Sequence, residues 1–385
     1  MKKYFILFTL MFPVFLNAQS GDFNKITDAG SGVYFMYYDS SDSKSTIVEF
    51  EDFIALVEAP VKDEGGNAKV LIEHQEAGEK ILNSLNNYFK NKPLKYFLHS
   101  HWHPHSVSTI NPFLKSGVKV VSTEANQNII KKFIDTLGIT NYKDNFIFVS
   151  DSLVISDSKN KLVAHRFTQK EYPNTPTEDY LFFYLPKQNI IHCACMYNKW
   201  EGVPVDGKEI LTGREEDLNR FLAGRNLKPE YLIRLTNEKN EPNDMQPLSG
   251  LENVISSGIR SSDIMKSLMD IDQMKLNESS DEIVNDLIKK NIPPSIINSA
   301  VYSLLRKKDL PKALSFARIQ ALLNPSDPNS WDTYGEVYYF MGDNLMAAYY
   351  EKQSKKVKPD YSSGGIEVWQ KDLENHQKIW DENIK

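Results

Sequence analysis

Four of the eight histidines of the chain lie within seven residues, at positions His99, His101, His103 and His105. In an extended backbone, side chains at alternate positions point to the same side, so these imidazoles can face one space. Neutral imidazole is a common ligand of zinc. The cluster therefore indicates a metal site, and the alternative is a surface loop in which the histidines are incidental.

An apolar segment, residues 95–98, runs directly into the cluster and is predicted to be a β-strand. The histidines would then lie at the carboxyl end of a sheet strand, where α/β folds bind their ligands. Strands and helices are expected to alternate along the first 255 residues, which predicts a layered α/β domain. The expected strands are 32–37, 45–50, 53–58, 118–121 and 231–235 with several more in 145–195, and the expected helices are 73–89, 112–115, 126–137 and 214–222.

The histidine segment resembles the His-x-His-x-Asp-His signature of the metallo-β-lactamase superfamily. Its surroundings are similar to the family in the same order. Glu58 ends a strand before the first helix, a hairpin covers 180–191, and a helix and strand cover 218–235. The resemblance implies a four-layer αββα metallo-β-lactamase-like sandwich over residues 22–255.

The resemblance places His101 and His103 on the first two ligand positions of the family. His105 stands at the position of the aspartate, and Ser106 stands at that of the next histidine. The aspartate normally orients the attacking water, and a metal-bound imidazole is a much weaker base. The family's hydrolytic mechanism is therefore less well supported than its fold.

Later ligand positions also depart from the family pattern. Cys195 falls on the position of the bridging ligand. Residues 172–177 contain no histidine, and Asn237 is a weak substitute where the last histidine is expected.

The remaining donors allow at most one tetrahedral zinc per chain, and no bound zinc is the alternative. A site that used all four donors would be closed and structural. A site that left one position open could hold a reactive water. The expected metal ligands are His101, His103, His105 and Cys195, and the sequence names no catalytic residue.

For two residues beside the expected ligands, the sequence leaves two interpretations open. His99 is either a second-sphere hydrogen-bond partner or a buried histidine at a strand end. Cys193 stands two positions before Cys195, and a disulfide at this spacing on a strand is strained. Both thiols are therefore expected to share one strand face, either reduced or bound to metal.

Helical patterns cover the chain after about residue 255, and a 34-residue offset relates several positions. The segment Trp331…Gly335…Tyr338…Gly342-Asp343 resembles a tetratricopeptide repeat, and the alternative is an ordinary helical tail. Two copies are visible, whereas stacked repeats usually need three or more, so residues 256–385 are expected to pack on the first domain or on a partner. The related pairs are Asp309 and Asp343, Ala313 and Ala347, and Pro325 and Pro359.

The N-terminus has the features of a signal peptide. Lys2 and Lys3 precede an apolar run over residues 4–16, and Ala18 offers a cleavage site. The run is short for a bilayer about 30 Å thick, which favours cleavage over the alternative of a retained anchor. Residues 1–18 are thus expected to be removed, leaving a periplasmic or secreted protein without an integral membrane segment.

Composition excludes some classes of function. The net charge of −6 argues against nucleic-acid binding, and two cysteines cannot form a disulfide framework. One hypothesis is an exported zinc-dependent hydrolase of esters, lactams or lactones. A second is an inactive relative that binds a small ligand, or a protein partner through its C-terminal helices. A third is a zinc- or redox-linked binding protein.

Overall fold

The computed structural model describes residues 24–38, 43–59, 68–107, 109–135, 142–197, 203–235 and 245–361. Side chains are described throughout these ranges except at 24, 38, 68–74, 104–105, 132–133, 135 and 143. The expected signal peptide, Asn237 and the end of the chain after residue 361 lie outside the described residues.

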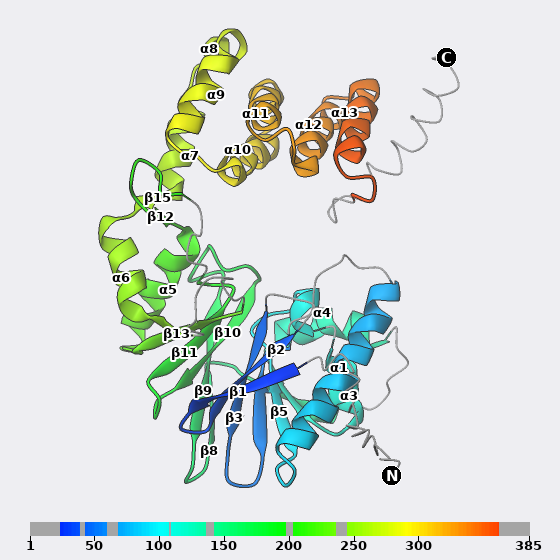
Figure 1. The fold of residues 1–385 in the computed structure, drawn as a ribbon, viewed down its shortest axis with the longest axis vertical. Helices are drawn as coiled ribbons and strands as arrows, with labels where there is room; N and C mark the ends of the chain where they lie inside the picture. Colours follow the sequence, from blue (N-terminus) through cyan, green and yellow to red (C-terminus); the bar gives the residue numbers. More distant parts are fainter. Residues whose placement is uncertain are drawn as a thin grey trace, which may run out of the picture.

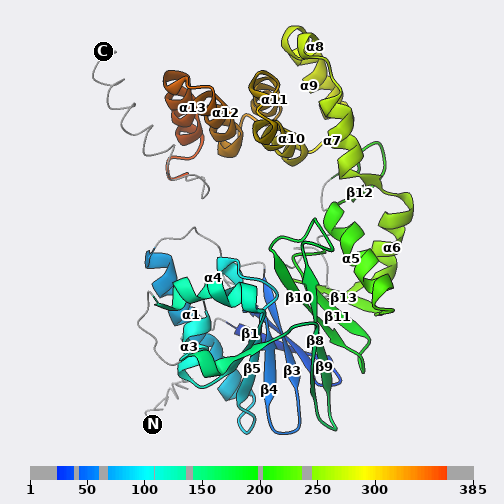
Figure 2. The same ribbon diagram turned by 180° about the vertical axis from the view of Figure 1, so that it is seen from behind.

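Two β-sheets dominate the first part of the chain (Figures 1 and 2). The seven strands of the first sheet follow one another in sequence order, antiparallel up to β4 and parallel from β4 to β7. These strands are β1 (Asn24–Gly30), β2 (Val33–Tyr38), β3 (Lys44–Glu49), β4 (Ile54–Val57), β5 (Leu94–Leu98), β6 (Lys119–Ser122) and β7 (Phe146–Phe148).

The second sheet has six strands in the order β14-β13-β11-β10-β9-β8. Only its β11–β13 pair is parallel. The strands are β8 (Ser152–Ser156), β9 (Lys161–Thr168), β10 (Asp179–Leu185), β11 (Ile190–Ala194), β13 (Tyr231–Arg234) and β14 (Gln246–Pro247).

Helices cover the outer face of each sheet. On the first sheet, Leu85 of α1 and Phe113 of α3 pack on Phe97 of β5. On the second sheet, Phe221 of α5 and Leu251 of α6 pack in one cluster with strand residues. The helices of the sandwich are α1 (Ala68–Tyr88), α2 (Pro104–Val107), α3 (Ile110–Lys115), α4 (Glu124–Asp135), the 3-10 turn Lys143–Asn145, α5 (Gly213–Gly224) and α6 (Leu248–Ser257).

A third apolar cluster joins the two sheets face to face. Val48, Val57 and Leu98 of the first sheet pack there with Leu181 and Phe183 of the second. With a helical layer outside each sheet, the order of layers is helix, sheet, sheet, helix. The four-layer αββα class expected from the sequence is therefore confirmed.

A helical region follows the sandwich. A short parallel pair, β12 (Ile210–Leu211) with β15 (Ile259–Arg260), links the two parts, so the expectation of no strand after residue 255 is wrong at this pair. Helices then continue to the end of the described residues. They are α7 (Ser261–Met269), α8 (Gln273–Glu278), α9 (Ser280–Lys289), α10 (Pro294–Lys307), α11 (Leu310–Leu323), α12 (Pro328–Phe340) and α13 (Asn344–Val357).

The 34-residue offset read from the sequence is present in these helices. The α10–α11 and α12–α13 pairs start at positions that differ by this offset. Asp309 and Asp343 each cap the second helix of a pair, accepting hydrogen bonds from Lys312 N and Met346 N. Gly335 lies against the Ala347 carbonyl, and a Cβ at this position would come within 3.0 Å of that oxygen, a tight contact. The assignment to the tetratricopeptide class stays a prediction.

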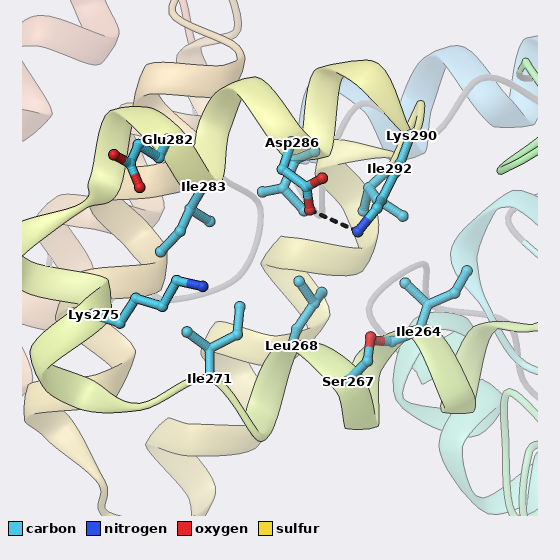
Figure 3. Close-up of a pocket in the computed structure, with 11 residues that line it drawn as sticks. Ile264, Ser267, Leu268, Ile271, Lys275, Glu282, Ile283, Asp286, Lys290 and Ile292 are labelled. Atoms are coloured by element: carbon cyan, nitrogen blue, oxygen red, sulfur yellow. Dashed lines mark hydrogen bonds and ion pairs between the residues drawn. The ribbon is translucent and has the colours of Figure 1, made fainter.

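The row of helices α10–α13 lies across from one edge of the sandwich (Figures 1 and 2). The turns between β3 and β4 and between β8 and β9 lie at the other edge. Because β5 runs parallel to β4, the loop after β5 lies on the same side of the sandwich as this row. A cavity of about 480 Å³ lies between α7 and α9 in the helical region (Figure 3).

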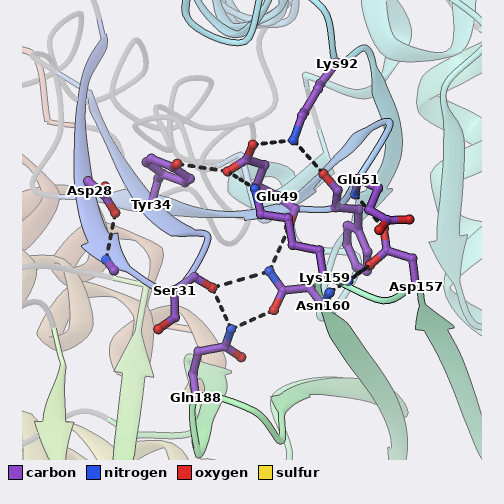
Figure 4. Close-up of polar contacts among 12 residues, drawn as sticks. Asp28, Ser31, Tyr34, Glu49, Glu51, Lys92, Asp157, Lys159, Asn160 and Gln188 are labelled. Atoms are coloured by element: carbon purple, nitrogen blue, oxygen red, sulfur yellow. Dashed lines mark hydrogen bonds and ion pairs between the residues drawn. The ribbon is translucent and has the colours of Figure 1, made fainter.

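A polar network ties the turns at that other edge together (Figure 4). The buried Asn160 side chain donates to the Glu49 carbonyl at 2.7 Å and accepts from Gln188 Nε2 at 2.7 Å. Gln188 Nε2 also donates to the Ser31 carbonyl at 2.8 Å. These bonds join turns from both sheets, so Asn160 fixes how the sheets meet at this edge.

We expect Asn160→Ala to lower the free energy of unfolding by about 2 kcal/mol, because it leaves the partly buried Glu49 carbonyl without its donor and removes the bond to Gln188. Urea denaturation would measure the loss. Asn128→Ala, at an exposed position on α4, should change stability by less than about 0.5 kcal/mol. Equal losses in the two variants would contradict the role of the network.

Candidate functional site

The histidine loop begins inside the protein and ends near its surface. His99, Ser100 and His101 are fully buried directly after β5, whereas His103 is partly exposed. The His103 carbonyl accepts a hydrogen bond from Ser106 N at 2.8 Å, which starts the short helix α2. The histidines therefore lie directly after the carboxyl end of β5, as predicted, and their exposure increases along the loop.

His99 belongs to the buried interior. Burial lowers the pKa of His99 to about 4, so the ring is neutral. Its Nδ1 lies 3.1 Å from the His101 carbonyl, which only accepts, so the proton of the neutral ring is on Nδ1. Its Nε2 has no partner among the described residues. His99 is therefore a buried strand-end histidine that also holds the backbone of the loop.

Glu58 supports the loop from the neighbouring strand. Its carboxylate Oε1 accepts from Ser100 N at 2.6 Å, and its own N–H donates to the Leu98 carbonyl at 2.8 Å. Burial raises the pKa of Glu58 to about 7 despite the hydrogen bond from Ser100. Its φ of 59° is left-handed, a strained conformation that persists where the surroundings fix it.

His101 and His103 face each other. His101 Nε2 lies 3.0 Å from His103 Nδ1, and the two ring centroids are 4.5 Å apart. The other nitrogen of His101, Nδ1, is 2.7 Å from Ser100 Oγ. The Trp102 and His103 rings are nearly perpendicular, with their centroids 5.0 Å apart. Ser100 and Trp102 thus orient the two imidazoles from either side.

The second sheet contributes Tyr180 and Cys195. The Tyr180 ring stacks on His101 with centroids 5.1 Å apart. The Tyr180 hydroxyl donates to the Cys193 carbonyl at 3.2 Å and accepts from Cys195 N at 2.9 Å. Burial and, to a smaller extent, the nearby Glu58 carboxylate raise the pKa of the Cys195 thiol to about 12. Tyr180 therefore joins the histidine loop to the Cys195 turn.

The two imidazoles fit part of a zinc site. Zn–N bonds of 2.0–2.1 Å place two nitrogens of one tetrahedral zinc about 3.3 Å apart. His101 Nε2 and His103 Nδ1 are hydrogen-bonded to each other at 3.0 Å, a separation close to this spacing, so zinc would have to replace the proton that they share. Within the described side chains, no group of three or more His, Cys, Asp or Glu residues could hold a metal ion. The His105 side chain lies outside the described residues, so the four-ligand set stays a prediction.

The two cysteines do not share a regular strand face. Cys193 lies in β11, where its thiol donates to the Ile233 carbonyl at 3.2 Å. Cys195 follows the end of the strand, after a register shift and a left-handed Ala194 with φ 43°. Both are free thiols. The expected alternation fails because the bulge at Ala194 interrupts it.

Sequence reasoning did not identify Ser100 and Tyr180 as site residues. Ser100 directly precedes the expected ligand His101, and only this adjacency in the sequence could have indicated that it orients the imidazole. Tyr180 carried no such signal, because its contact with His101 joins two sheets. At this end of the sandwich the two sheets are joined by a hydrogen bond from Leu181 N to the Ser100 carbonyl at 2.8 Å.

A cavity of about 360 Å³ opens at the same edge of the sandwich, between the start of α4, the end of β7 and strands β9 and β10. Arg166 and Asp179 line it and form an ion pair at 2.7 Å, with the Asp179 side chain nearly buried. Asp179 directly precedes Tyr180 in β10, but no residue of the histidine loop lines this cavity.

No family model matches the chain, and no curated protein matches it. Among solved structures, the chain is similar to a metallo-β-lactamase from Pontibacter korlensis, with 16% identity and a TM-score of 0.43 over 60% of this chain and 97% of that one. A metallo-β-lactamase from Hirschia baltica is 15% identical, with a TM-score of 0.41 over 60% of this chain and 96% of that one. A metallo-β-lactamase from Pseudomonas aeruginosa in its mono-zinc form is 16% identical, with a TM-score of 0.41 over 60% of this chain and 92% of that one.

At such low sequence identity a structural similarity bears on the fold alone, and all three TM-scores are below 0.5. The αββα class therefore rests on the layers and strand order of this chain. No helix in the described part of the chain is both long and apolar enough to cross a membrane.

Proposed function

We propose that the chain is an exported, hydrolase-type αββα protein that uses a single zinc to cleave a small ester, lactam or lactone. The observation that carries the proposal is the pair of imidazole nitrogens of His101 and His103, 3.0 Å apart at the carboxyl end of β5. Either His105 or Cys195 would supply the third ligand, which leaves the fourth position of a tetrahedral zinc open. When bound with an open position, zinc supplies a water acidic enough to attack a carbonyl.

The surrounding residues position this pair. Ser100 fixes the orientation of His101 through its Nδ1, and Glu58 fixes Ser100 through its backbone N–H. Tyr180 covers the inner face of His101 and keeps water out. His103 is the more exposed of the two histidines, so a substrate would approach from its side.

Hydrolysis of a chromogenic ester and a chromogenic β-lactam by the untagged, zinc-loaded chain tests the proposal. We expect turnover of at least one substrate, reduced more than about 100-fold in His103→Ala because a metal ligand is lost. His165→Gln is the matched control, since His165 packs on Phe221 of α5 and lies outside the loop. Equal rates in wild type and His103→Ala would contradict the proposal.

A second candidate is a non-catalytic protein that binds a partner through the tail. Phe340, Met341, Leu345 and Tyr349, at the end of α12 and on α13, are 42–50% exposed. Exposed apolar side chains grouped in this way are typical of interaction sites. Absence of zinc binding, together with a partner lost in a Leu345→Glu, Tyr349→Glu double variant, would favour this candidate over the first.

A further inference from the structure

A segment between β11 and α5 supplies part of the hydrophobic core of the helical tail, α7–α13. Val205 and Ile210 of this segment are only 1% and 2% exposed. They belong to the same apolar cluster as Ile264 and Leu268 of α7, not to the clusters of the sandwich. The tail therefore packs on a segment that the sandwich provides, and the proposed hydrolase function gives this contact no role.

Backbone hydrogen bonds and an ion pair fix the same junction. Strand β12 pairs in parallel with β15, with Ile210 opposite Ile259 (Figure 1). Ile259 N donates to the Glu209 carbonyl at 2.9 Å. Arg260 of β15 forms an ion pair with Glu216, in the first turn of α5, at 2.7 Å. Because both charged side chains are partly exposed, we expect the buried apolar contacts to contribute more to the junction than this ion pair.

Helix α5 connects this junction to the histidine site. It begins directly after β12, where Thr212 and Glu215 form a capping box that fixes the direction of the first turn. Arg214 in that turn donates from Nη1 to the Cys195 carbonyl at 3.3 Å. On its other side, Cys195 donates from its backbone N–H to the Tyr180 hydroxyl at 2.9 Å. The Cys195 turn is thus held between α5 and Tyr180.

Tyr180 completes a continuous series of contacts from the tail to the histidine loop. Its ring stacks on the His101 ring with centroids 5.1 Å apart, and both side chains are fully buried. The series runs from β15 to β12, then through the start of α5 and the Cys195 turn to Tyr180 and His101. Closely packed groups transmit a displacement to their neighbours. A shift of β12 would therefore reach the His101 ring.

We propose that the helical tail is a positioning element of the histidine site. Through β15 and the core around Val205 it holds β12, and through β12 it holds the Cys195 turn and the orientation of His101. The arrangement does not require bound metal, and its effect on metal binding rests on the proposed function. A tail that served only as an attached binding module would leave the Cys195 turn unaffected by changes at Val205.

Thiol labelling of the full chain, with tandem mass spectrometry to assign each label, tests this positioning. Cys195 is partly exposed in its turn, whereas Cys193 is fully buried in β11. Labelling of a protected thiol follows local opening, so Val205→Ser should raise the Cys195 rate about fivefold and leave the Cys193 rate unchanged. Val203→Ser is the matched control, since Val203 lies two positions earlier and is 64% exposed. It should label like wild type.

A second pair of variants keeps the test decisive where Val205→Ser does not fold. Ile210→Ala should raise the Cys195 labelling rate in the same way, and the conservative Ile210→Val should keep a rate close to that of the wild type. An equal rise at Cys193 and Cys195 would indicate a loss of global stability and would overturn the positioning role. Equal Cys195 rates in the wild type, Val205→Ser and Ile210→Ala would overturn it as well.

Cobalt(II), used as a spectroscopic substitute for zinc, separates this inference from the proposed function. In Val205→Ser we expect the visible cobalt spectrum to shift and cobalt affinity to fall about fivefold, with neither change in Val203→Ser. A wild type that binds no cobalt would contradict the proposed function, and thiol labelling would still decide the positioning role. Faster labelling of Cys195 with an unchanged cobalt spectrum and affinity would overturn the last step, from Tyr180 to His101.

Discussion

Replacing Glu58 by glutamine should stabilise the protein at pH 8 by about 3 kcal/mol and change its stability little at pH 4.5. Burial raises the pKa of Glu58 from 4.5 to about 7 in the folded state. Between these two values the folded protein binds more protons than the unfolded chain, so the stability of the wild type falls as pH rises. The shift of about 2.5 pKa units corresponds to about 3 kcal/mol.

Glutamine mimics the protonated carboxyl group, because its amide oxygen can still accept from Ser100 N. The variant therefore keeps the support of the histidine loop without the buried charge. Urea denaturation at the two pH values would measure the difference. Glu79→Gln, on the exposed face of α1, should change stability by less than about 0.5 kcal/mol at either pH. A Glu58→Gln effect that is the same at both pH values would contradict a buried, proton-linked Glu58.

Zinc should stabilise the wild type strongly and the His101→Ala variant hardly at all. A ligand that binds only the folded state stabilises it by about 4 kcal/mol at a thousand times its dissociation constant. His101 is fully buried between Ser100, His103 and Tyr180, so its ring is held in place before metal binds. The proposed site should thus need little reorganisation to accept the ion.

Denaturation with and without zinc, and after chelation, would measure this linkage. Ser100→Ala is an informative companion, since it removes the hydrogen bond to His101 Nδ1 but leaves both proposed ligands. We expect Ser100→Ala to weaken zinc binding about 10-fold or more, less than His101→Ala does. Equal zinc-induced stabilisation of wild type and His101→Ala would show that zinc binds elsewhere.

Local pattern predicted the parts of the site that lie close together in sequence. The strand β5 and the position of the histidines after its carboxyl end were predicted correctly, and His101 and His103 do face each other. His99 does not join them, because its ring is buried and bonded to the His101 carbonyl. The αββα layers followed from the family resemblance and from alternating helices and strands. The two helix pairs of the tail followed from the offset between Asp309 and Asp343.

Contacts between the sheets could not be predicted from the sequence. Tyr180 reaches His101 only because β10 meets the end of β5 through the Leu181–Ser100 hydrogen bond. The bulge at Ala194 was equally hidden, since alanine carries no signal for a left-handed backbone. Both features depend on how distant strands pair, which local propensity does not encode.

Native mass spectrometry of the untagged full chain in zinc-replete buffer tests most directly that His101 and His103 hold one zinc. The prediction is one zinc per chain in the wild type and in His165→Gln, and none in His103→Ala. A wild type without zinc, or a His103→Ala variant that retains it, would contradict the proposed site.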